Sequence, residues 1–220
     1  MSLLLAVPMV PLQMVVGDWS AKVVAKSQPV KFAAMEGQFE TRSNAPLHIG
    51  GFPNEKTREM QYSIQIPSLL SWIAYGDFNA EVKGLNDFPP ADTPPVAIVH
   101  FAFQTMVGIG SFMMLVALWC VVSYWRTRAW PKSKLFLRSI VVLGPLSIIA
   151  LLSGWVVTEV GRQPWIVQGY MRTSEAVTQA TGVWQVFGIT MAIYFLLGVT
   201  TVVILRQLAK VPLGENENGA

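Results

Sequence analysis

Three long runs without a single charged side chain constrain the fold of this chain more than any other feature of its sequence. They cover residues 96–123, 139–158 and 183–205. A helix needs about 20 consecutive apolar residues to cross the hydrocarbon core of a bilayer, so each run predicts one transmembrane helix. Charged residues make up only 13% of the chain. Soluble domains contain roughly a quarter, which supports the same assignment.

Residues 1–16 form a fourth apolar run, which is shorter and contains Pro8 and Pro11. It predicts a partial transmembrane helix whose beginning lies outside this chain. No basic segment precedes the run and no small-residue cleavage site follows it, which argues against a signal peptide. We therefore expect an all-α fold: a multi-span transmembrane helix bundle with about three full spans, one partial N-terminal span and a long extracytoplasmic loop.

The long loop covers residues 17–97 and holds most of the polar sequence. Loops of this length often carry function, although its composition alone fits a solvated cap outside the membrane equally well. We expect two short amphipathic helices within it, over residues 20–37 and 59–75, the second interrupted at Pro67. Its Pro-rich end predicts an extended entry into the first full span.

Basic residues predict the orientation of the spans. The connection over residues 124–138 carries five basic residues and no acidic one. By the positive-inside rule this connection is expected in the cytoplasm, together with the tail over residues 206–220. The parity of the spans then places the loop 17–97 and the outer loop 159–182 on the same, extracytoplasmic face.

Composition and spacing exclude several other classes of protein. The single cysteine, Cys120, lies within a span, so no disulfide framework or thiolate metal cluster is expected. The net charge of +3 comes from basic residues beside the spans and indicates topology, so we expect no nucleic-acid partner. The chain has no phosphate-binding glycine loop, nucleophile elbow or His/Cys cluster at metal-ligand spacing.

A charged and aromatic motif closes the second full span. Glu159 and Arg162 are three residues apart, which places them on one helical face, and Pro164 then prevents the helix from continuing. At the edge of the hydrocarbon layer such a pair is costly unless a partner or ligand satisfies it. Two interpretations follow from the residues alone: a helix-end ion pair beside an interfacial tryptophan, or a cofactor or substrate site at the membrane–water boundary.

The full string around this motif, GWVVTEVGRQPW at residues 154–165, resembles the signature of subunit I of cytochrome bd-type quinol oxidases. The resemblance implies that Glu159 is an axial ligand of the high-spin haem b. It also implies that Arg162 pairs with a haem propionate or a neighbouring acid. Trp155 and Trp165 are then expected to pack against the porphyrin, or to anchor the chain at the interface, which is the default for tryptophan.

The string FAFQTMVG at residues 101–108 is similar to the family segment whose methionine ligates the low-spin haem b. The resemblance implies that Met106 is this ligand, although a methionine in a span usually only fills the core. The family commonly has an arginine two residues earlier, where this chain has Gln104, so a cationic partner for propionates or quinol is missing. His100 and Gln104 are expected to face the bundle interior, and Met106 projects from another face.

The string KVVAKSQPVKFAAMEG at residues 22–37 is similar to the start of the family's quinol-binding loop. The resemblance implies that Lys31 and Glu36 hydrogen-bond the quinol and accept its protons. The residues alone favour an ordinary amphipathic helix with a solvated charged side. Asp18 and Glu40 are weaker candidates for the same site, and His48 is expected to be solvated.

These resemblances cover nearly the whole chain and imply one part of a respiratory terminal oxidase. Such an oxidase oxidises quinol at the outer membrane face and passes electrons through low-spin and high-spin haem b and haem d, or a further haem b in its place, to reduce O2 to water. Two histidines cannot supply the axial ligands of three haems. We therefore expect the chain to be inactive alone, and to need the N-terminal half of subunit I, or an equivalent chain with the missing histidines, together with subunit II.

The expected location is the lipid bilayer of a bacterial or archaeal plasma membrane. The main alternative is a non-catalytic membrane scaffold, or a fragment of the same subunit, that does not bind haem by itself. Gln104 and the missing first half favour that alternative, whereas the motifs around Glu159 and Met106 oppose it. A third, weaker hypothesis is that the chain is a quinone-binding subunit of another respiratory complex.

Overall fold

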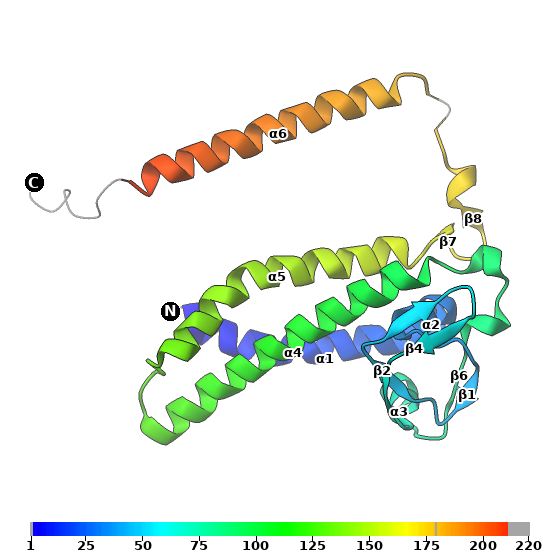
Figure 1. The fold of residues 1–220 in the computed structure, drawn as a ribbon, viewed down its shortest axis with the longest axis horizontal. Coiled ribbons are helices and arrows are strands. Elements are labelled where there is room, and N and C mark those ends of the chain that lie inside the picture. Colours follow the sequence, from blue (N-terminus) through cyan, green and yellow to red (C-terminus); the bar gives the residue numbers. More distant parts are fainter. Residues whose placement is uncertain (1, 179, 211–220) are drawn as a thin grey trace, which may run out of the picture. The chain divides into compact units, whose positions relative to one another are not determined.

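The computed structural model describes residues 2–178 and 180–210, and its long elements are helices (Figure 1). Three helices in these ranges are long and apolar enough to cross a membrane: α4 (Val96–Thr127), α5 (Lys134–Val160) and α6 (Val183–Leu208). The expected fold class is confirmed. The chain divides into two compact units, residues 1–176 and 177–220, and α6 is the long element of the second unit.

The transmembrane helices extend beyond the uncharged runs. α4 and α6 begin at the expected residues, but α4 continues to Thr127 and α5 begins at Lys134, so much of the expected connection 124–138 is helical. Long basic side chains at a helix end can reach water without breaking the helix, which explains the extension. Ser133 caps α5, since its hydroxyl accepts a hydrogen bond from the Phe136 N–H at 3.3 Å. Residue 179 of the outer loop and residues 211–220 of the tail lie outside the described residues.

The expected partial helix over residues 1–16 is the first part of a longer helix, α1 (Ser2–Ser27), with Pro8 and Pro11 inside it. Residue 1 lies outside the described residues. The expected helix over residues 20–37 is therefore divided. α1 ends before Gln28, which has φ −137° and ψ 65°, and α2 (Pro29–Glu36) follows. A proline disfavours the helical conformation in the residue before it, and this accounts for the break.

The middle of the long loop consists of short antiparallel strand pairs. The pairs are β1 (Arg42–Ser43) with β6 (Glu81–Val82), β2 (Leu47–Ile49) with β5 (Ile64–Ile66), and β3 (Phe52–Asn54) with β4 (Glu59–Gln61). The expected helix over residues 59–75 is wrong up to Pro67, and only α3 (Leu69–Tyr75) is helical. Cross-strand pairing after the turn at Gly50 and Gly51 overrides a weak local helical preference.

The remaining short elements lie near the ends of the spans. Before α4 there are two 3-10 turns, η1 (Leu85–Asp87) and η2 (Pro90–Asp92). After α5 come β7 (Trp165–Val167), β8 (Met171–Arg172) and the 3-10 turn η3 (Thr173–Glu175). β7 and β8 pair antiparallel, with Trp165 opposite Arg172.

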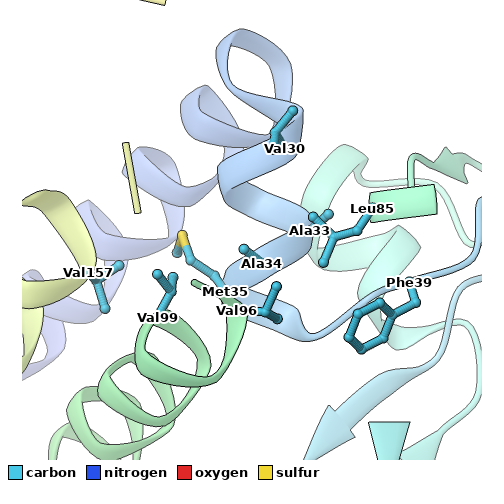
Figure 2. Close-up of a cluster of buried hydrophobic side chains, with 9 residues drawn as sticks. All are labelled: Val30, Ala33, Ala34, Met35, Phe39, Leu85, Val96, Val99 and Val157. Carbon is cyan, nitrogen blue, oxygen red and sulfur yellow. The ribbon is translucent and has the colours of Figure 1, made fainter. Parts of the chain in front are cut away.

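A buried apolar cluster fixes α2 against α4 and α5. Figure 2 shows its members: Val30, Ala33, Ala34 and Met35 of α2, Val96 and Val99 of α4, Val157 of α5, and Phe39 and Leu85 of the loop. Complete burial of one valine-sized side chain contributes about 1.5–3 kcal/mol. The cluster therefore determines where α2 lies relative to the ends of the two spans, which run side by side in Figure 1.

At Gly84 the loop backbone lies close to the segment that follows α2. The Leu85 N–H donates to the Gln38 carbonyl oxygen at 3.0 Å, and the Asn86 N–H donates to the Phe39 carbonyl oxygen at 2.9 Å. A Cβ atom on Gly84 would lie 2.6 Å or less from backbone atoms of Phe39 and Glu40. Backbone atoms cannot move aside as the end of a side chain can, so this position requires glycine.

We expect Gly84→Ala to lower the free energy of unfolding of the loop by about 1–3 kcal/mol, because the new methyl group overlaps main-chain atoms. Thermal unfolding in detergent, with limited proteolysis of the loop, measures the change. Gly17→Ala is the matched control, since nothing lies within 4 Å of a Cβ at Gly17 in α1. Equal melting temperatures for both variants would contradict the close approach.

Candidate functional site

Glu159 and Arg162 form an ion pair at the end of α5. Their charged atoms are 2.6 Å apart, and their side chains are 40% and 44% exposed. The two side chains meet as their spacing predicts, although α5 ends at Val160 and Arg162 lies in the turn that follows. An ion pair this exposed contributes little stability, so it does not by itself explain the two charges beside an apolar helix. The carboxylate is accessible to a further ligand.

The segment after this pair is tied to the entry of α4. The Arg172 guanidinium donates to an Asp92 carboxylate oxygen at 2.6 Å and lies 4.8 Å from the centre of the Trp165 ring. The Thr173 hydroxyl donates to the Gln163 side-chain oxygen at 2.7 Å. Trp165 is thus half-buried by a cation–π contact. Trp155, by contrast, is 65% exposed.

Lys31 of α2 reaches the same end of α5. Its ammonium group donates to the Thr158 carbonyl oxygen at 3.4 Å, and its side-chain stem lies over Gly161. Burial and the nearby Arg162 guanidinium lower the pKa of Lys31, and the Glu159 carboxylate partly offsets both effects. The structure therefore brings Lys31 of the loop motif against the end of α5, where the charges of Glu159 and Arg162 act on it. Gly161 leaves room for the Lys31 side chain. Apart from its place in the string at residues 154–165, nothing in the sequence predicts this role.

Glu36 lies at the other end of α2 and is only 3% exposed. Burial raises its pKa to about 8, so this carboxyl group is neutral near pH 7. Lys31 and Glu36 therefore differ in environment: the lysine contacts the end of α5, and the glutamic acid is inside the loop. Asp18 and Glu40, the weaker candidates, are in surface ion pairs with Lys22 and Arg42.

Met106 and Gln104 project from different faces of α4, as expected. The Met106 sulfur lies 3.0 Å from the position of a Cβ on Gly154, so the thioether packs against α5 within the motif segment. Gln104 instead holds the loop. Its amide nitrogen donates to the His48 carbonyl oxygen at 2.9 Å, and its amide oxygen accepts from the Gly50 N–H at 3.4 Å. The neutral Gln104 side chain therefore holds the loop backbone by hydrogen bonds.

The two histidines are both buried. His100 is fully buried, and its Nδ1 lies 2.9 Å from the Met35 carbonyl oxygen, which confirms the expected inward face. The expectation that His48 is solvated is wrong, because it is only 7% exposed and its Nδ1 lies 2.8 Å from the Ser63 hydroxyl. Sequence reasoning missed His48 because it did not detect the strand that turns the side chain inward.

The side chains present are suited to supply single axial ligands to haem iron. The described residues contain no group of three or more His, Cys, Asp or Glu side chains that could hold a metal ion. Haem iron needs only axial ligands, and a thioether is one of the side-chain groups that holds it. The Met106 sulfur between two apolar helices and the accessible Glu159 carboxylate beside a cation suit such single positions.

Comparisons with known proteins give a consistent result. A family model described as "Cytochrome bd terminal oxidase subunit I" matches residues 1–212. A curated relative is the putative cytochrome bd menaquinol oxidase subunit I of Bacillus subtilis (strain 168). It is 37% identical over 208 residues, which cover 93% of this chain and 46% of the relative. The cytochrome bd-II ubiquinol oxidase subunit 1 of Escherichia coli (strain K12) is 26% identical, and the match covers 88% of this chain and 51% of that one.

A solved structure supports the same assignment. The bd oxidase from Geobacillus thermodenitrificans matches with a TM-score of 0.78 and 37% sequence identity, over 94% of this chain and 48% of that chain. The chain thus spans about half the length of the relatives that it matches.

We expect stability to fall as pH rises from 4.5 to 8, because the Glu36 carboxyl ionises near 4.5 when unfolded and near 8 when folded. Between these values the unfolded state has lost a proton that the folded state keeps, which costs up to about 1.4 kcal/mol per pH unit. Glu36→Gln should remove this slope and be the more stable protein at the upper pH. Glu40→Gln, at an exposed position, is the control. Thermal unfolding across this range measures the slopes, and equal slopes for both variants would contradict the burial argument.

Proposed function

This chain belongs to the cytochrome bd terminal oxidase subunit I family, and from that premise we propose that it forms the C-terminal part of a respiratory quinol oxidase. The observation that carries the proposal is the contact between Lys31 and the end of α5. This contact places α2, the candidate quinol-binding segment, against the end of α5, which carries the candidate haem ligand Glu159. An enzyme that passes electrons from quinol to haem requires this proximity.

The quinol is proposed to bind between α2 and the end of α5. The Lys31 ammonium group donates hydrogen bonds and is well placed to hold a quinol oxygen, while Glu36 supplies a carboxyl group for proton transfer. Glu36 is buried and Lys31 is partly buried, and a lysine with a lowered pKa gives up its own proton more readily. Relatives named as menaquinol and as ubiquinol oxidases both match, so the proposal names a quinol as the substrate class.

Haem is proposed to be held by Met106 and by Glu159. Met106 would ligate the low-spin haem b and Glu159 the high-spin haem b, beside a haem d or a further haem b. When bound, these groups supply the redox chemistry that takes electrons from quinol and reduces O2 to water. Arg162 would neutralise a propionate, and Trp165, fixed by Arg172, would pack beside the ring or anchor the interface.

The remaining ligands and walls of the haem sites are proposed to come from other protein segments. Relatives are about twice as long as the match, and the rest of subunit I would supply the histidine ligands, with subunit II as a further partner. The basic ends of α4 and α5 support a cytoplasmic position for the connection between them. The loop and the Glu159 motif would then face the outside of the plasma membrane.

A scaffold that binds no haem is the second candidate function. Gln104 favours it, because this side chain is committed to the loop backbone and offers no positive charge to a propionate or a quinol. The accessible Glu159 carboxylate opposes it, because a pure scaffold has no need for an ion pair at this depth.

A reduced-minus-oxidised optical spectrum of the complete complex separates these functions. Glu159→Ala should lose most of the high-spin haem b absorbance, and Met106→Leu should lose that of the low-spin haem b, because each removes an axial ligand while keeping the helix. Glu81→Ala, at an exposed carboxylate in β6, is the control and should leave the spectrum unchanged. Unchanged spectra in all three variants would support the scaffold.

A further inference from the structure

Buried polar atoms without a partner gather at one place in the loop. Within the described residues, three buried side-chain atoms lack a hydrogen-bond partner: Glu36 Oε2, Gln38 Oε1 and His100 Nε2. Glu36 is the last residue of α2 and Gln38 follows it by two residues, and His100 contacts the same end of α2 through the Met35 carbonyl oxygen at 2.9 Å. The His100 ring also lies within 3.4 Å of the position of a Cβ on Gly37. Such atoms are normally satisfied by buried water or a ligand.

The hydrogen bond to Met35 fixes the state of the His100 ring. A carbonyl oxygen only accepts, so Nδ1 carries the hydrogen and donates it, and Nε2 of the neutral ring has a free lone pair. That lone pair is fully buried and has no protein donor to bind. It can therefore accept a proton.

His48 continues this arrangement toward the loop surface. Gln104, one turn after His100 on α4, donates to the His48 carbonyl oxygen at 2.9 Å. The His48 ring in turn lies 2.8 Å from the hydroxyl of Ser63, which is partly exposed. Burial, the charge of His100 and that of Arg42 lower the pKa of His48.

Resting on the proposed function, we propose that Glu36, His100 and His48 form a buried proton-release path from the quinol site to the loop surface at Ser63. Oxidation of one quinol breaks two O–H bonds and releases two protons and two electrons. The electrons leave to haem iron, which the proposed function supplies. Glu36 holds a proton at neutral pH, passes it through buried water to Nε2 of His100, and then takes the next proton from the quinol. The His100 imidazolium returns to its neutral form by giving the proton from Nε2, again through buried water, to Nε2 of the His48 ring. Nδ1 of His48 then passes its own hydrogen to the Ser63 hydroxyl, which releases a proton to solvent.

The groups that face this path come from several elements. α2 contributes Glu36, β2 contributes His48, and Arg42 of β1 acts on His48 from the loop. On α4 itself the neighbouring polar side chain is Gln104, which is neutral.

The test uses two histidine variants of the complete quinol oxidase. His100→Asn keeps an amide donor near the Met35 carbonyl but removes Nε2, and His48→Asn keeps a polar partner for Ser63 but removes the ring. Each should lower kcat for quinol oxidation by about 100-fold, which is the lower end of what a positioned acid–base group contributes. KM should not change, since Lys31 is intact.

A second electron donor separates proton release from a structural role. Ascorbate with tetramethyl-p-phenylenediamine delivers single electrons without breaking a quinol O–H bond, so oxygen consumption with this donor should be unchanged in both variants. Tyr62→Phe, at a 91% exposed position beside Ser63, is the matched control and should keep both rates.

The outcomes are distinct. Slower quinol oxidation with an unchanged rate from the artificial donor supports the path. Unchanged quinol oxidation in both histidine variants overturns it, and so does an equal loss with both donors, which would show that the rings only hold the fold. A wild-type complex that binds haem and consumes oxygen with the artificial donor but cannot oxidise quinol would overturn the proposed function itself, and the path with it.

Discussion

The packing of α2 on the ends of α4 and α5 is the interaction on which the candidate site depends. α2 is too short to be stable alone, so it exists because its apolar face is buried against two long helices. This burial places the lysine at one end of α2 on the end of α5 and the glutamic acid at its other end inside the loop. A small apolar cluster thus sets the distances between all the charged groups of the site (Figure 2).

The bilayer explains why the polar and charged side chains of the candidate site lie near the ends of the spans. Hydrocarbon offers no hydrogen bonds, so the spans must be helices that satisfy their own backbone, and charges are confined to their ends. Glu159 and Arg162 lie where α5 stops, and Gln104 and His100 lie near the start of α4. The loop covers these ends, and its backbone groups find partners in the same side chains, as with Gln104.

The sequence predicts the spans well and the loop poorly, for physical reasons. Hydrophobicity over twenty residues is a strong signal, so α4 and α6 begin at the expected residues. Strands of two or three residues carry no such signal, and their pairing depends on turns and on partners far along the chain. The Glu159–Arg162 pair followed from spacing alone, whereas the burial of His48 and the contact of Lys31 with Gly161 are tertiary facts that no local pattern encodes.

The unbroken course of α1 has a mechanical consequence. A helix is stiff along its axis, and only Gln28 separates α1 from the short helix that carries Lys31 (Figure 1). A shift of the part of α1 that follows Pro11 is therefore transmitted to the lysine beside the end of α5. The geometry around Lys31 thus depends on how α1 is packed, although α1 itself carries neither member of the Glu159–Arg162 pair.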